Sequence, residues 1–190
     1  MRTGPAVLTL AAVLVGVGLT GCSAGPTSAG APPVQSASAP ADPIPPLRDV
    51  RDLAGTPVCA LFTPEQLAAN RIDLPPRPKD VNGDAGCVWT DRAHTREIRI
   101  FTDLKYDVLH NVYAQRATYP VFEVTEVAGH PAIRTKNLVD GTMCFFRVTA
   151  APRQTLNIGF TSLGNGLEEP CGPAKALAAT VIGNLPPGQG

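Results

Sequence analysis

The residues best suited to chemistry in this 190-residue sequence are five cysteines and three histidines. His94, His110 and His130 lie far apart, and none forms the H-x-x-x-H or H-E-x-x-H spacing that holds zinc on one face of a helix. The sequence also lacks the G-x-S-x-G nucleophile elbow and the glycine-rich phosphate loops. We therefore expect surface or structural roles for the histidines, no metal, no cofactor and no catalytic residue.

The first cysteine follows a short apolar segment near the N-terminus. Residues 6–19 are uncharged and would span about 21 Å as a helix, less than the ~30 Å core of a bilayer, which favours a cleaved signal over a membrane span. The next residues, Leu19-Thr20-Gly21-Cys22, resemble the bacterial lipobox. The resemblance implies a signal peptide at 1–21, cleavage between Gly21 and Cys22, and a lipid on Cys22 that anchors the protein in the membrane. The alternative is an ordinary signal peptide followed by a chance cysteine.

The remaining cysteines are Cys59, Cys87, Cys144 and Cys171. An exported chain with an even number of cysteines typically holds them as disulfides. Of the three pairings, we favour Cys59–Cys87 with Cys144–Cys171, because each pair closes a compact local unit. A tetrahedral zinc site is the weaker alternative, since no two cysteines have the C-x-x-C spacing.

A stretch rich in proline, alanine and serine covers residues 23–46. It holds seven of the 20 prolines and has no aromatic or basic residue, so it cannot bury enough apolar surface to offset its ordering entropy. We expect a disordered stalk over residues 22–57, with residues 47–54 forming a short helix at the domain edge. A single domain over 58–186 and a tail at 187–190 complete the predicted organisation.

One acidic segment invites comparison with a calcium loop. Asp80, Asn82, Asp84 and Asp91 occupy positions 1, 3, 5 and 12 of such a loop. The sixth position, where the loop needs glycine for its sharp turn, is Ala85, and the bidentate glutamate at the end is missing. We therefore interpret this segment as a polar turn before a strand.

A basic cluster and a lone tryptophan are the other candidates for binding. Arg92, His94 and Arg96 alternate, with Arg99 nearby, so an extended chain would place the first three on one face. They form either a solvated hairpin tip or a contact for anionic headgroups or envelope polymers. Trp89 lies two residues after a cysteine, which favours core packing over ligand stacking.

The hydrophobic periodicity predicts an α+β domain. Helices are expected over 63–69, where Thr63 and Gln66 form a capping box, over about 15 residues beginning at Thr102 or Asp103, and over 168–185. Short connections favour antiparallel neighbours. We expect a twisted, mostly antiparallel sheet of about six strands flanked by two or three helices. Six segments have the composition and alternation of strands: residues 87–90, 97–102, 122–127, 131–135, 142–149 and 155–161.

Several short signatures along the domain carry a family resemblance. They are CALFTPEQL at 59–67, GCVW at 86–89, VAGHPA at 127–132, and the cysteines at 144 and 171. Together they resemble a family of small actinobacterial lipoproteins, mycobacterial members among them, that carry a domain of unknown function. The resemblance implies an envelope lipoprotein with a fold similar to the Mog1/PsbP group, a helix-flanked antiparallel sheet, and it implies no functional residue.

The formal net charge of zero bears on which kinds of molecule the protein binds. Sixteen basic residues balance sixteen acidic ones, which argues against a nucleic-acid binder. We expect a lipid-anchored protein on the outer face of the cytoplasmic membrane, held there through Cys22. The expected function is a non-enzymatic module of the cell envelope that binds an envelope protein or a small apolar ligand. The alternatives are an assembly lipoprotein without a ligand and an envelope hydrolase with dispersed catalytic residues.

Overall fold

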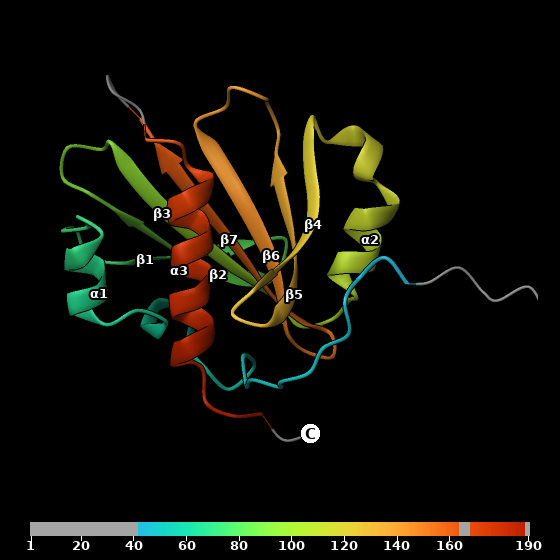
Figure 1. Cartoon of the computed structure of the whole chain (residues 1–190). Helices are drawn as coiled ribbons and strands as arrows, with labels where there is room; N and C mark the ends of the chain where they lie inside the picture. Colours follow the sequence, from blue (N-terminus) through green and yellow to red (C-terminus); the bar gives the residue numbers. More distant parts are fainter. Residues whose placement is uncertain (1–41, 164–167, 189–190) are drawn as a thin grey trace, which may run out of the picture. The chain divides into compact units, whose positions relative to one another are not determined.

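A single antiparallel sheet organises the part of the chain that the computed structural model describes, residues 42–163 and 168–188 (Figure 1). Seven strands lie in the order β1-β2-β3-β7-β6-β5-β4, and every neighbouring pair is antiparallel. The α+β class and the antiparallel sheet are as predicted. The strands are β1 Arg77–Val81, β2 Asp84–Thr90, β3 Arg96–Asp103, β4 Val121–Val127, β5 His130–Lys136, β6 Met143–Ala151 and β7 Gln154–Ser162.

The prediction of about six strands missed β1, the edge strand. All five of its residues are exposed, and its sequence includes a proline and two basic residues, which suit an edge where one row of backbone groups faces solvent. A turn at Asn82 and Gly83, both with positive φ, joins β1 to β2. This is the turn geometry that fits the twist of a hairpin.

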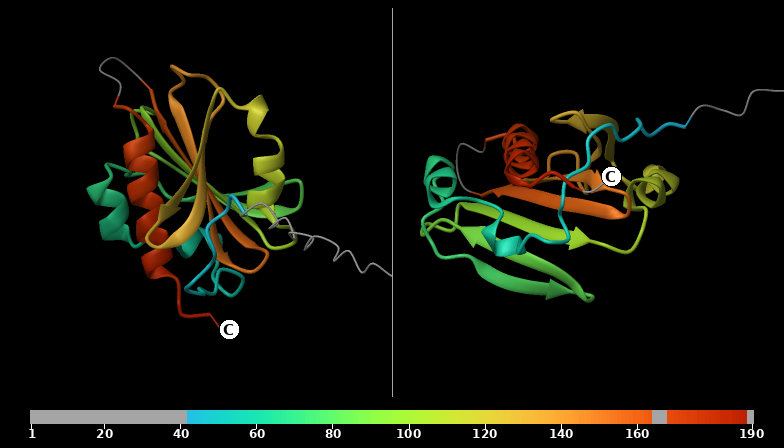
Figure 2. Two further views of the ribbon diagram at one scale, coloured as in Figure 1. Left: turned by 45° about the vertical axis from the view of Figure 1, so that its right-hand side comes forward. Right: turned by 90° about the horizontal axis from the view of Figure 1, so that it is seen from below.

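The helix α3, Cys171–Asn184, packs on one face of the sheet against β6 and β7 (Figure 2). Its buried stripe is the predicted one and joins the inward side chains of β2, β3, β6 and β7 in the main core. The helix begins three residues later than predicted, because Glu169 precedes it and accepts hydrogen bonds from the backbone N–H of Cys171 and Gly172. The stripe consists of Ala174, Leu177, Ala178, Val181 and Ile182.

A short helix, α1 Pro64–Ala69, confirms the predicted capping box. The Thr63 hydroxyl accepts from the Gln66 backbone N–H at 3.2 Å, and the Gln66 side chain accepts from the Thr63 N–H at 3.0 Å. Two 3-10 turns, η1 Val58–Ala60 and η2 Arg116–Thr118, complete the helical elements. Among the described helices, none has the length and apolar character needed to cross a bilayer.

The helix α2, Val108–Ala114, covers a smaller part of the opposite sheet face. Its Leu109 and Val112 form a second cluster with Ile133 of β5, whose neighbour Ala132 belongs to the main core. The prediction of about 15 helical residues from Thr102 or Asp103 was wrong. Both residues belong to β3, and the Asp103 carboxylate accepts hydrogen bonds from the Lys105 and Tyr106 N–H groups in the following loop. The helix therefore begins only after Asp107.

The segment that precedes η1 is extended rather than helical, which corrects the helix predicted over 47–54. The Arg51 N–H donates to the Ala150 carbonyl at 2.8 Å, and the Asp52 N–H donates to the Pro186 carbonyl at 2.9 Å. Ile44 and Leu53 are buried, in the second cluster and the main core respectively. Residues 42–57, which composition assigns to the stalk, therefore pack on the domain.

Two disulfides join peripheral elements to the sheet, with the favoured pairing. Cys59 of η1 bonds to Cys87 of β2, and Cys144 of β6 bonds to Cys171 at the start of α3. The partners are 28 and 27 positions apart in the sequence. Each bond ties a helical element to the strand on which it packs.

Loss of either disulfide should destabilise the domain to a similar extent. Replacing both Cys144 and Cys171 by alanine should lower the free energy of unfolding by about 3 kcal/mol. Without the disulfide the unfolded chain gains conformational entropy, which favours unfolding. The paired change of Cys59 and Cys87 provides the matched comparison, since its loop is almost equally long. Urea denaturation measures both; a loss below about 1 kcal/mol in either variant would show that loop closure is not their main contribution.

Candidate functional site

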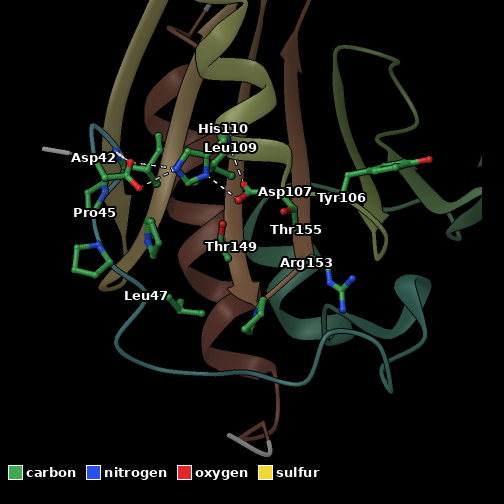
Figure 3. A pocket seen from close by; sticks show the side chains of 14 residues that line it. Asp42, Pro45, Leu47, Tyr106, Asp107, Leu109, His110, Thr149, Arg153 and Thr155 are labelled. Carbon is green, nitrogen blue, oxygen red and sulfur yellow. Dashed lines mark hydrogen bonds and ion pairs between the residues drawn. The ribbon is translucent and has the colours of Figure 1, made fainter. Parts of the chain in front are cut away.

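A cleft of about 380 Å³ lies between residues 42–47, α2 and the sheet ends on the α2 face (Figure 3). One wall is the extended N-terminal segment and another is the loop before α2 with the first turn of that helix. The floor comes from β5, β6 and β7. The lining residues are Asp42, Ile44, Pro45, Pro46, Leu47, Tyr106, Asp107, Leu109, His110, Pro131, Thr149, Pro152, Arg153 and Thr155.

Apolar side chains make up most of the cleft. Ile44 and Leu109 belong to the buried cluster below it, and four prolines contribute rigid surface to its walls. Thr149 and Thr155 face each other across β6 and β7 and supply hydroxyl groups at the floor. This composition, apolar with few polar groups, is typical of sites for small ligands.

One histidine joins the two walls at the rim. His110 Nδ1 lies 2.8 Å from Asp107 Oδ2, and its Nε2 lies 3.0 Å from Asp42 Oδ2 (Figure 3). Asp107 also caps α2 by accepting from the His110 backbone N–H, and Asp42 accepts from the Ile44 N–H at 2.9 Å. We call Asp42, Asp107 and His110 the latch, since these contacts hold residues 42–44 against α2.

The latch is sensitive to protonation. Hydrogen bonds to Asp107 and then to Asp42 raise the pKa of His110 above its ordinary value. The Ile44 N–H and then His110 lower the pKa of Asp42. With a folded-state pKa above the unfolded value of about 6.5, the imidazolium contributes its full stabilisation below that pH. The contribution is lost as pH rises through the raised pKa of His110.

The latch geometry favours binding over nucleophilic catalysis. A histidine that activates a hydroxyl or thiol needs a ring nitrogen directed at that nucleophile. Both nitrogens of His110 face carboxylates, and the four cysteines of the domain are in disulfides. The arrangement can fix a wall of the cleft and offer a polar rim to a ligand.

The other two histidines lie elsewhere. His94 occupies the β2–β3 turn with positive φ. His130 is 1% exposed, and its Nδ1 lies 2.9 Å from the Thr149 carbonyl oxygen, a structural contact. Sequence reasoning assigned His110 to the same surface or structural class and missed the latch. The Asp107-to-His110 spacing on one helix turn was a readable signal, whereas Asp42 is 68 positions away from its partner.

The acidic segment compared with a calcium loop is not assembled into one site. The Asp80 carboxylate accepts from the Gly83 N–H in the β1–β2 turn. Asp91 lies beyond the other end of β2, where its buried carboxylate accepts from the N–H groups of Thr95 and Arg96. In residues 42–163 and 168–188, no three His, Cys, Asp or Glu side chains are grouped to hold a metal ion.

The basic residues near the β2–β3 turn do not form one surface either. Arg96 pairs with Glu168 and lies over the Phe160 ring, on the α3 face. Arg99 pairs with Glu97 on the opposite face, since it alternates with the core residues Ile98 and Ile100. Arg92 and His94 lie in the β2–β3 turn, where His94 has positive φ. The chain is not extended there, so the predicted shared face of Arg92, His94 and Arg96 does not form. 

Trp89 is fully buried with its ring edge-on to Phe62 at 5.3 Å, so the core interpretation is confirmed. Gly21 and Cys22, the predicted cleavage and lipidation residues, lie outside the described residues.

Removing the latch should loosen residues 42–47 in a pH-dependent manner. The segment contains three prolines, so its backbone N–H groups are those of Asp42, Ile44 and Leu47. In the wild-type protein, hydrogen exchange of the Ile44 and Leu47 amides, corrected for intrinsic rates, should be slower at pH 6 than at pH 8.5. His110→Gln should exchange faster at pH 6 and lose most of this difference, because glutamine cannot carry the charge. His94→Asn is the control, since asparagine tolerates the positive φ there. Equal protection in H110Q and the wild type at pH 6 would contradict the latch.

Comparison with known proteins gives a family without an assigned activity. The family model described as "Protein of unknown function (DUF3558)" matches residues 17–184. No curated protein matches the chain, and no solved structure matches it. Because the matched region covers most of the sequence, the chain belongs to the DUF3558 family.

Proposed function

We propose that this protein is a lipid-anchored lipoprotein of the cell envelope whose domain binds a small apolar ligand in the cleft beside α2. The cleft itself carries the proposal. Its volume, about 380 Å³, falls within the ~300–1,000 Å³ of typical small-molecule sites. Its surface is mainly apolar, with a histidine and two carboxylates at one rim.

The location rests on two observations. The Leu19-Thr20-Gly21-Cys22 motif resembles a lipobox, which supports export and a lipid anchor on Cys22 at the outer face of the cytoplasmic membrane. The two disulfides support an oxidising compartment outside the cytoplasm, because the cytosol keeps thiols reduced. 

The position of the cleft suits an anchored binding module. Residues 42–47 form one wall and lie at the end of the proline-rich stretch that composition assigns to the stalk. A ligand that contacts this wall would stabilise the packing of residues 42–47 on the domain, as would a protonated His110. Ligand occupancy and the attachment of the stalk to the domain would thus be linked through the same few residues.

A different observation favours the alternative of an assembly lipoprotein. Leu138 and Val139, in the β5–β6 loop, are 68% and 62% exposed. Such side chains suit contact with another protein. They lie outside the lining of the cleft, so the two functions can be separated by substitution.

Binding of the neutral apolar dye N-phenyl-1-naphthylamine to the full-length protein tests the cleft. The dye should fluoresce on binding, and Leu47→Asp should weaken binding about tenfold or more, because a carboxylate in an apolar wall must be desolvated. Leu138→Asp is the matched control and should leave binding unchanged. Similar affinity for the dye in L47D and the wild type, or loss of dye binding only in L138D, would show that the dye binds outside the cleft.

A further inference from the structure

The sheet face opposite α3 is largely open on β1, β2, β3 and β7. Figure 2 (right) shows α3 across one face, and no α-helix of the described residues lies over the other face of β1, β2 and β3. The strand registers align the side chains of this open face in rows. One row runs from Ile133 through Arg147, Asn157 and Phe101, and the next runs from Thr135 through Phe145, Gly159 and Arg99.

Two glycines let aromatic rings lie close to the sheet backbone on this face. A Cβ at Gly159 would lie 2.6 Å from the Phe145 ring, and a Cβ at Gly86 would overlap the Phe101 ring. The rings therefore cover the backbone of the neighbouring strand. Both phenylalanines remain partly exposed, so the face offers aromatic surface to solvent.

Arg147 lies beside this surface without a counter-ion. Its Nη1 donates to the Thr135 hydroxyl at 2.7 Å, and its guanidinium carbon lies 5.6 Å from the Tyr119 ring centre and 5.9 Å from that of Phe145. Within the described part of the chain, no carboxylate oxygen comes within 4.0 Å of it. One of its five N–H donors is thus satisfied by a side-chain oxygen.

The other partly buried cations of the described domain do have carboxylate partners. Arg96 pairs with Glu168, Arg99 with Glu97, Arg134 with Glu123 at 2.7 Å, and Lys136 with Glu169 at 3.6 Å. A half-buried charge without a partner is unfavourable. Arg147 therefore differs from the other partly buried cations of the domain in lacking a carboxylate partner.

The guanidinium of Arg147 is charged and only partly buried. Burial lowers the pKa of Arg147, but arginine stays protonated in proteins. The buried polar atoms that lack a partner in the described residues belong to Trp89, Arg134 and Thr161, and none to Arg147. The nitrogens of Arg147 without a protein partner are therefore not completely buried.

We propose that Arg147 is the anion anchor of a second binding site, which takes a small ligand with a carboxylate or phosphate group on an aromatic or apolar body. The oxyanion would accept from the free N–H groups of Arg147 in the bidentate geometry that guanidinium favours. The body would lie on the Phe145 ring, within reach of Asn157 across β6 and β7. A flat membrane surface fits less well, because the guanidinium is partly buried and lies 5.6 Å and 5.9 Å from the Tyr119 and Phe145 ring centres. This site goes beyond the apolar ligand of the cleft and does not depend on it.

Calorimetric titration of the full-length protein with phenyl phosphate, benzoate and neutral benzyl alcohol tests the site. The two anions should bind, and benzyl alcohol should bind at least tenfold more weakly. Arg147→Gln should weaken anion binding about tenfold or more, because it removes charge-assisted hydrogen bonds. Arg116→Gln is the matched control: the Arg116 guanidinium carbon also lies over a tyrosine ring, 4.6 Å from the centre of Tyr113, but Arg116 is an exposed residue of η2.

Several results would overturn the proposal. They are no anion binding by the folded wild type, equal affinity in R147Q and the wild type, and binding only to phosphatidylglycerol vesicles. If R147Q does not fold, Arg147→Lys replaces it; a point charge should bind phenyl phosphate several-fold more weakly than the fork of arginine, and equal affinity would contradict the site. Dye binding in the cleft should be unchanged in these variants, which separates failure here from failure of the proposed function.

Discussion

The packing of α3 against β6 and β7 is the interaction on which the rest of the domain depends. The helix buries its apolar stripe on the two longest strands, and Cys144–Cys171 fixes its first residue to β6. Because this packing occupies one face of the sheet, the opposite face is left to the shorter α2 and to solvent. Both the cleft and Arg147 lie on that opposite face. Because helices cover the two faces of the sheet unequally, the face opposite α3 remains available for binding.

Much of the fold could be predicted because its main elements have strong local patterns. Alternation along β6 and β7, the stripe of α3 and the Thr63 capping box are each visible in a few neighbouring residues. β1 could not be found in this way, since an exposed edge strand has no apolar face to alternate. The length of α2 was overestimated because Leu104 continues the apolar period of the helix, although it is 44% exposed in the preceding loop.

The candidate sites were harder to predict because they depend on contacts between distant segments. The latch joins a helix to Asp42, a residue whose surroundings have the composition of a stalk. Ile44 also contributes, since this branched apolar side chain among prolines packs in the second buried cluster. Arg147 alternates with core residues as any outward side chain does, and only the arrangement of carboxylates in three dimensions shows that it has none nearby.

Native mass spectrometry of the full-length protein, extracted from its own membranes, tests the central claim most directly. We predict a chain that begins at Cys22, carries acyl chains there, and retains a small molecule that is lost when Leu47 is replaced by aspartate. A chain that keeps residues 1–21 without a lipid, or a lipidated chain with no bound molecule, would contradict the account of an anchored ligand-binding module.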